Sequence, residues 1–274
     1  MTVPLPPYRE LVLTAFGLFG RNGQEWIPVG TLVRLLEDCG ADAPGVRATI
    51  SRMTKRGNLE NRRRGRNSEY RLSPNLVYAF SSGDRRIFEP VRASPDDPWL
   101  LVTFSVSESQ RDVRHRLRSG LSRLGFGTIS PGLWIAPVHV EEEARQYLER
   151  HGLMEHTAIF RAHSVHGGPD ADWWNLDLLE SRYSWFLQAY TEVSERVDES
   201  DSSLQTAFSV YMVMLTHWRQ LPYLDPGLPD DMLPPTWPGH RAWDLFIALD
   251  RALHAAADEY ARSVLEEDAV QASS

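Results

Sequence analysis

The spacing of apolar residues predicts three helices and a hairpin near the start of the chain. Three runs with helical spacing lie between residues 7 and 57, and each begins near a proline and ends at a glycine. The prolines are Pro7, Pro28 and Pro44, and the glycines are Gly20, Gly40 and Gly57. Two short extended runs, residues 59–63 and 69–72, follow around Gly65 and predict a hairpin. A further short helix is expected from Pro74 through Phe80.

The third predicted helix has one apolar face and one polar face. Asp42 is a plausible cap at its start. Val46, Ile50 and Met53 are spaced by four and three residues, so they share one buried face. The opposite face should then present Pro44, Arg47, Ala48, Ser51, Arg52 and Lys55 to solvent. Three helices followed by a hairpin predict a winged helix-turn-helix domain over residues 1–90.

The middle of the chain alternates short strands with charged helices. Prolines at 90, 95 and 98 mark a domain boundary. The predicted order is a strand at 99–104, a helix at 108–124, two strands within 126–135, a helix at 140–151 and a strand at 157–165. This βαββαβ order predicts a ferredoxin-like sandwich over residues 96–168.

The remainder, residues 170–274, shows only helical spacing. Apolar residues step by threes and fours within 176–193, 204–218 and 245–260, and a proline-studded loop covers 222–238. The prediction is therefore an α+β multidomain protein. Its parts are an N-terminal winged helix-turn-helix, a central ferredoxin-like α/β sandwich and an all-helical C-terminal domain.

Charge is distributed unevenly along the chain. Residues 1–90 carry 14 Lys/Arg and 9 Asp/Glu, a net of +5, whereas residues 91–274 carry 15 Lys/Arg and 28 Asp/Glu, a net of −13. Within 40–71, nine basic residues stand against Asp42, Glu60 and Glu69. A basic module joined to an acidic remainder indicates double-stranded DNA as a partner of the first domain.

In a winged helix-turn-helix, the third helix enters the major groove and the wing touches the DNA backbone or the minor groove. The predicted DNA contacts are Arg47, Ser51, Arg52 and Lys55 on the helix, with Arg62, Arg63, Arg64 and Arg66 on the wing. Two plainer interpretations stay open, namely a solvated basic surface and a protein-interaction module.

Other features bound the class of protein. The chain has no long apolar run and no signal-peptide pattern, so we expect a cytoplasmic protein that does not enter a membrane. Its single cysteine, Cys39, fits a reducing compartment and is expected to be a core residue. The nine histidines show no zinc-type spacing, and nucleophile-elbow, phosphate-loop and dinucleotide motifs are missing from the sequence. We therefore predict no catalytic residues, metal or cofactor.

Aromatic residues concentrate in the acidic C-terminal part. The candidates for binding an aryl group and its anionic attachment are Trp174, Tyr183, Trp218 and Arg219. Two alternatives stay open: the aromatics form ordinary core, and Arg219 forms a structural ion pair with Asp225.

Several short motifs in order make the chain resemble the PaaX family, named for the phenylacetic-acid catabolon repressor. They are the segments 44–53, 55–59, 63–66, 70–72, 86–88, 99–102, 116–118, 125–127, 131–134, 217–219, 224–226 and 233–239, the last reading Leu-Pro-Pro-Thr-Trp-Pro-Gly. The resemblance implies a three-domain repressor that binds its operator as a homodimer. It also implies release by an acyl- or aryl-coenzyme A, phenylacetyl-coenzyme A in the founding members, or by a related metabolite.

The middle segment also resembles the small ferredoxin-like nuclease of CRISPR adaptation. In those nucleases a metal-binding aspartate closes the first strand, whereas here the strand ends Thr103-Phe104-Ser105. Because Mg²⁺ prefers oxygen ligands of this kind, the missing carboxylate disfavours a metal-dependent nuclease. A coupling or dimerisation role is expected instead. A regulator that answers to a protein partner is a further alternative.

Overall fold

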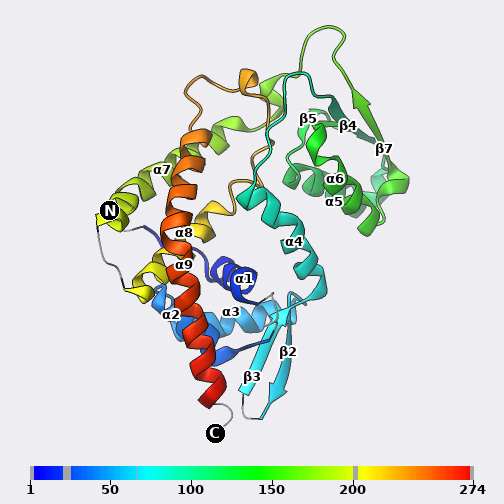
Figure 1. Cartoon of the computed structure of the whole chain (residues 1–274). Helices are drawn as coiled ribbons and strands as arrows, with labels where there is room; N and C mark the ends of the chain where they lie inside the picture. Colours follow the sequence, from blue (N-terminus) through cyan, green and yellow to red (C-terminus); the bar gives the residue numbers. More distant parts are fainter. Residues whose placement is uncertain (1–2, 21–25, 66, 200–202, 272–274) are drawn as a thin grey trace. The chain divides into compact units, whose positions relative to one another are not determined.

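A computed structural model of the chain describes residues 3–20, 26–65, 67–199 and 203–271. It is a mixed α/β structure with two small antiparallel sheets (Figure 1). The chain divides into two compact units, each built from separated stretches. Unit 1 contains residues 1–83, 185–219 and 240–274, and unit 2 contains 84–184 and 220–239. None of the helices in the described part combines the length and apolar character that crossing a membrane requires.

The helices and the hairpin predicted at the start of unit 1 are confirmed. The elements are α1 (Tyr8–Phe19), β1 (Ile27–Pro28), α2 (Val29–Asp38), α3 (Ala43–Lys55), β2 (Leu59–Arg64), β3 (Asn67–Leu72) and α4 (Pro74–Phe88). The strand order is β1-β3-β2. Strand β1 was not predicted, since two residues are too few to show a period. Helix α4 runs eight residues beyond its predicted end at Phe80.

Local signals explain how α3 begins and which way it faces. The Asp42 side chain accepts a hydrogen bond from the Gly45 backbone N–H at 2.8 Å, so it caps the helix as predicted. The Tyr8 hydroxyl donates to the same carboxylate at 2.6 Å, which ties α1 to the start of α3. Val46, Ile50 and Met53 are at most 2% exposed, so the predicted buried face is confirmed.

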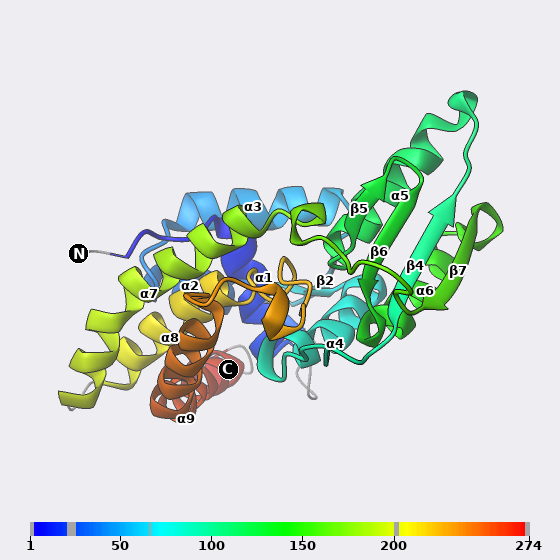
Figure 2. The same cartoon turned by 90° about the horizontal axis from the view of Figure 1, so that it is seen from above.

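Three helices from the later part of the chain belong with unit 1 for most of their length. They are α7 (Leu176–Glu199, in unit 1 from residue 185), α8 (Leu204–Trp218) and α9 (Gly239–Gln271). The Trp218 ring stacks on Phe246 of α9 with centroids 4.5 Å apart and lies 5.2 Å from Phe186 of α7. These rings pack the three helices side by side (Figures 1 and 2).

The same helices hold α1 and α2 through one buried and one partly buried polar contact. Thr216 of α8 donates to Thr14 of α1 at 2.9 Å, and both side chains are buried. Tyr260 of α9 donates to Asp38 at the end of α2 at 2.8 Å. The compact unit thus groups the N-terminal elements with helices for which the sequence predicted a separate domain from residue 170.

Unit 2 is built around the second sheet. Its elements are β4 (Trp99–Phe104), α5 (Arg111–Arg123), β5 (Gly127–Ser130), β6 (Leu133–Pro137), α6 (Glu141–Arg150) and β7 (Thr157–Ala162). The βαββαβ order expected from the sequence is confirmed, and all neighbouring strands run antiparallel in the order β5-β6-β4-β7.

Side chains pack against both faces of this sheet. Leu100, Val102 and Phe104 point to one side, where Leu117 of α5 and Leu148 of α6 join them in one core. The other side carries Trp99, Leu101 and Ile135, which pack with Trp174 and Leu228 from two later segments. The alternation along β4 therefore places two different layers on the two faces.

Candidate nucleic-acid interface

The polar face of α3 is exposed as predicted. The six residues expected there, Pro44, Arg47, Ala48, Ser51, Arg52 and Lys55, are all exposed. Arg52 donates to Thr49 at 2.9 Å, a contact along the helix that leaves most of its guanidinium available. Within the described residues, no carboxylate forms an ion pair with Arg47, Arg52 or Lys55. Their role in DNA contact stays a prediction.

The three described arginines that were predicted to contact DNA from the hairpin differ in environment. Arg62 lies opposite Glu69 in the strand register, and its Nε donates to that carboxylate at 2.6 Å. The Arg62 guanidinium also lies 4.3 Å from the centroid of the Trp26 ring. Arg63 and Arg64 are exposed, and Arg64 Nη1 is 3.8 Å from Glu69. Arg66 lies outside the described residues.

Sequence reasoning missed two parts of this surface. Arg56 is exposed at the C-terminal cap of α3, directly after the predicted Lys55. Arg71 lies 4.6 Å from the Trp26 centroid and pairs with Glu60 at 2.7 Å, so Trp26 is flanked by two guanidinium groups. Counting register back from the turn at Gly65 would have found the cross-strand pairs, because opposite residues share a face.

The four residues predicted to hold an effector are divided between the two units. Trp218 is 2% exposed within the aromatic core of unit 1. Arg219 lies in the same unit, where it pairs with Glu10 and donates to Thr14 at 2.9 Å. Tyr183 and Trp174 belong to unit 2. The core alternative therefore describes Trp218, and Glu10 is one partner of Arg219. The alternative ion pair of Arg219 with Asp225 stays a prediction.

Tyr183 and Asp225 form a buried cluster in unit 2. The Tyr183 hydroxyl donates to Asp225 at 2.8 Å, and Arg92 pairs with the same carboxylate at 3.1 Å. Burial, together with the neighbouring carboxylate, raises the pKa of Tyr183 well above its ordinary value. This tyrosine is thus a neutral hydrogen-bond donor that holds the loop containing Asp225.

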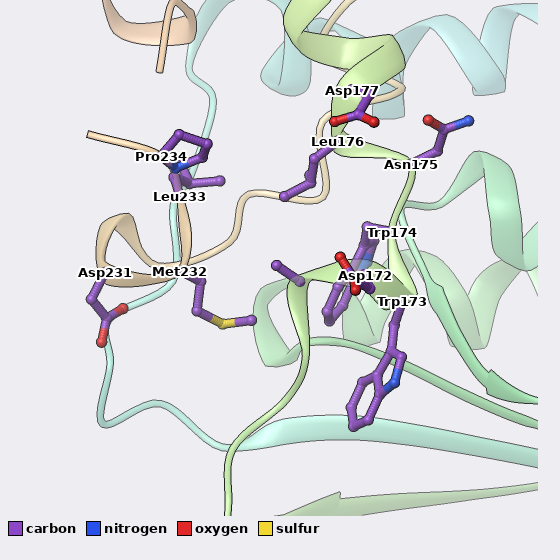
Figure 3. A pocket seen from close by; sticks show the side chains of 11 residues that line it. Asp172, Trp173, Trp174, Asn175, Leu176, Asp177, Asp231, Met232, Leu233 and Pro234 are labelled. Carbon is purple, nitrogen blue, oxygen red and sulfur yellow. The ribbon is translucent and has the colours of Figure 1, made fainter. Parts of the chain in front are cut away.

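Trp174 lines a pocket within unit 2. Residues 171–177 and 231–234 surround a space of about 710 Å³ (Figure 3). The indole Nε1 of Trp174 donates to the Gly125 carbonyl at 2.9 Å. Of the four predicted effector residues, Trp174 is the one that lines this pocket.

The candidate metal ligands considered from the sequence were the end of the first strand of the second sheet and the histidines. Strand β4 ends at Phe104, so Ser105 follows it directly, where the CRISPR nucleases carry their aspartate. Across the described residues, histidine, cysteine and carboxylate side chains do not gather in groups of three or more that could hold a metal ion. Burial lowers the pKa of His139 and His217 to about 4, so both are neutral near pH 7.

Comparisons with known proteins point to one family along almost the whole chain. Three family models match in order: residues 8–76 match PaaX-like protein, 92–173 the PaaX protein central Cas2-like domain, and 174–263 the PaaX-like protein C-terminal domain. The transcriptional repressor PaaX of Escherichia coli K12 is 26% identical over 260 residues, which is 90% of this chain and 81% of that protein.

A solved structure shares the fold. It is the uncharacterized protein Rv0674 from Mycobacterium tuberculosis, with a TM-score of 0.53, 22% identity, and coverage of 91% of this chain and 98% of that one. The three models together span the basic module, the second sheet and the long helices described above. The chain therefore belongs to the PaaX family and is a PaaX-like transcriptional regulator.

Proposed function

We propose that this protein is a repressor that binds double-stranded operator DNA through α3 and the β2–β3 hairpin and is released by a small metabolite. The observation that carries the proposal is the exposed basic face of α3, with unpaired cations, in a segment (residues 40–71) where nine basic residues stand against three acidic ones in an acidic chain. The similarity to a transcriptional repressor supports the direction of regulation.

A winged helix-turn-helix for residues 1–90 is supported by the geometry of unit 1. Helices α2 and α3 are separated by residues 39–42, and Gly40 has a φ of +94°. A turn of this length with a glycine is typical of the helix-turn-helix motif. The hairpin follows α3 directly and carries Arg63 and Arg64 on an exposed tip, where a wing would meet phosphates.

We further propose that the central segment, residues 96–168, is a ferredoxin-like domain through which two copies associate. The strand order β5-β6-β4-β7 and the placement of α5 and α6 on one face support that fold. Strand β7 is at the sheet edge, and its Phe160 is 54% exposed. An exposed edge strand of this kind is suited to pair with a second copy. A homodimer would bind an inverted repeat.

We assign the binding of the effector, and the shift that releases the DNA, to the part of the chain from residue 170 on. The helices α8 and α9 contact α1 and α2, so a shift in them changes the support of α3. An effector acts only if it binds the released state more tightly than the DNA-bound state. The family resemblance suggests an acyl- or aryl-coenzyme A, or a related metabolite, as that effector.

A mobility shift on the DNA upstream of the protein's own gene, at two salt concentrations, tests the proposal. We expect tight binding that weakens steeply with salt, because phosphate contacts release counterions. Arg52→Ala combined with Arg64→Ala should abolish it, whereas Arg145→Ala, an exposed arginine on α6, should not. If a genome-wide operator search finds no specific site, or if the double variant binds normally, the proposal fails.

Two further arms test the effector and the alternatives. Addition of phenylacetyl-coenzyme A should release the DNA if the effector class is that of the founding members. Incubation of labelled RNA or DNA with Mn²⁺ or Mg²⁺ should leave it intact. Cleavage that an active-site substitution removes would instead establish a nuclease. If one protein partner is captured in stoichiometric amount and it alone alters DNA binding, the effector is that protein and not a metabolite.

A further inference from the structure

The pocket of unit 2 is formed by two segments that cover the second face of the sheet. One wall is the stretch 171–177, and the other is 231–234 (Figure 3). Leu176 extends from the first wall, and Met232 and Leu233 extend from the second into the space between them. All three pack against the cluster of Ile135, Trp174 and Leu228, so the pocket has an apolar floor.

This floor is held in place by contacts that leave little freedom. Trp174 is 8% exposed, and its indole is fixed by the hydrogen bond to Gly125. A Cβ at position 127 would lie 2.7 Å from Trp174 Cε2, so Gly127 permits the close approach of the ring to β5. The Trp173 ring lies 6.3 Å from that of Trp174 and is half-buried. A preformed aromatic surface of this kind suits a flat or apolar ligand.

The charged residues around the pocket are all acidic. Asp172 and Asp177 lie on the first wall and Asp231 on the second, and the lining contains no Lys, Arg or His. All three aspartates are exposed, and within the described residues none of them forms an ion pair. By contrast, the adjacent Asp230 pairs with Arg92 at 3.8 Å. The lining of the pocket therefore carries a net negative charge.

We propose that this pocket binds an organic monocation with an aromatic or apolar body, of the aryl-alkyl amine class. The apolar body packs on Leu176, Met232 and the tryptophan surface, and the ammonium group is attracted by the carboxylates and by an indole face. A coenzyme A thioester carries several phosphate charges, which three carboxylates repel. A thioester effector would bind elsewhere in the chain.

The role of this pocket in regulation rests on the proposed function. Within that function, the amine is an effector that changes the affinity of the protein for its operator. Binding of the amine can be measured in the absence of DNA, so the two claims are tested separately.

The test uses the full chain and three probes that share a phenyl ring and differ in the end group. They are 2-phenylethylamine, 2-phenylethanol and 3-phenylpropanoate, titrated by calorimetry at low and high salt. We expect the amine to bind at least about fivefold more tightly than the alcohol, and the carboxylate not to bind. High salt should weaken the binding of the amine and leave that of the alcohol unchanged.

Variants locate the site. Asp172→Asn together with Asp177→Asn should weaken the amine at least about fivefold and leave the alcohol unaffected. Asp244→Asn, an exposed aspartate of α9, is the matched control and should change neither. Equal binding of the amine and the carboxylate, or an unchanged amine affinity in the double variant, would overturn the proposal.

A mobility shift with the amine then separates the two claims. Loss or gain of operator affinity that requires Asp172 and Asp177 supports the effector role. Amine binding that leaves operator affinity unchanged refutes that role. If the chain binds no operator at all, the proposed function fails, while the titration still decides what the pocket binds.

Discussion

Arg62 and Arg63 are neighbours in β2, but the structure predicts opposite consequences for removing them. Arg62→Ala takes away the nearest cation from Glu69, a carboxylate that is 6% exposed, and also the stacking on Trp26. Leaving a buried acceptor without its charged partner lowers the free energy of unfolding by about 1–3 kcal/mol. Because Arg62 is 44% exposed and Arg64 lies 3.8 Å from Glu69, the lower half of that range, about 1–2 kcal/mol, is expected.

Arg63→Ala should leave stability unchanged and weaken DNA binding. Arg63 faces Ser68 across the hairpin and is exposed, so its loss orphans no buried group. If it meets one phosphate, the slope of log affinity against log salt should fall by about 0.9. Arg62→Ala should instead lower the melting temperature by about 3–6 °C, the shift expected for a unit of this size.

Circular dichroism melts and fluorescence anisotropy on labelled operator, recorded for both variants, separate the two roles. Glu69→Gln in the Arg62→Ala background is the internal control, and it should restore most of the lost stability, since it removes the orphaned charge. The reasoning is refuted if Arg62→Ala melts like the parent protein and reduces the salt slope as much as Arg63→Ala does.

Three further predictions concern groups inside unit 1. Thr14→Val removes an acceptor from Arg219 and should cost about 1–3 kcal/mol in urea unfolding, whereas Thr191→Val, an exposed threonine of α7, should be close to neutral. Burial lowers the pKa of His217 from 6.5 to about 4, so its neutral form stabilises the fold above pH 6.5 and that contribution is lost as the pH falls toward 4. The melting temperature of His217→Gln should therefore fall less between pH 7 and pH 4.5 than that of the parent protein. The same pH dependence in both proteins would contradict the burial argument. Burial raises the pKa of Cys39 to about 12, so maleimide at pH 7.5 should label it only after unfolding; rapid labelling of the native protein would show that this site opens.

Local signals in the sequence were enough for the α3 face and for the middle sheet. The cap at Asp42 and the spacing of Val46, Ile50 and Met53 each depend on residues within a turn or two of each other. The same holds for β4, whose five apolar residues around Thr103 needed no distant information. These elements are specified by periods and caps that a single stretch of chain contains.

Partners far apart in the sequence were beyond this kind of reasoning. The Arg219–Glu10 pair joins residues 209 positions apart, and no period or motif relates them. The same limit explains the candidate effector residues. Trp218 and Tyr183 are both aromatic, both in helices and both buried, but Trp218 belongs to unit 1 and Tyr183 to unit 2. Arg62 is an intermediate case, since the hairpin register alone pairs it with Glu69.

The discontinuity of unit 1 has a consequence for how the protein is made. The stretches 1–83, 185–219 and 240–274 form one compact body, so the chain leaves that body after α4 has begun and completes it only with α9. On the ribosome, the polar contacts of α1 and α2 with Thr216 and Tyr260 form only after more than two hundred further residues have been made. Competence to repress would thus arrive only with complete synthesis, and a prematurely terminated chain would present an unfinished apolar surface to the proteases and chaperones of the cell.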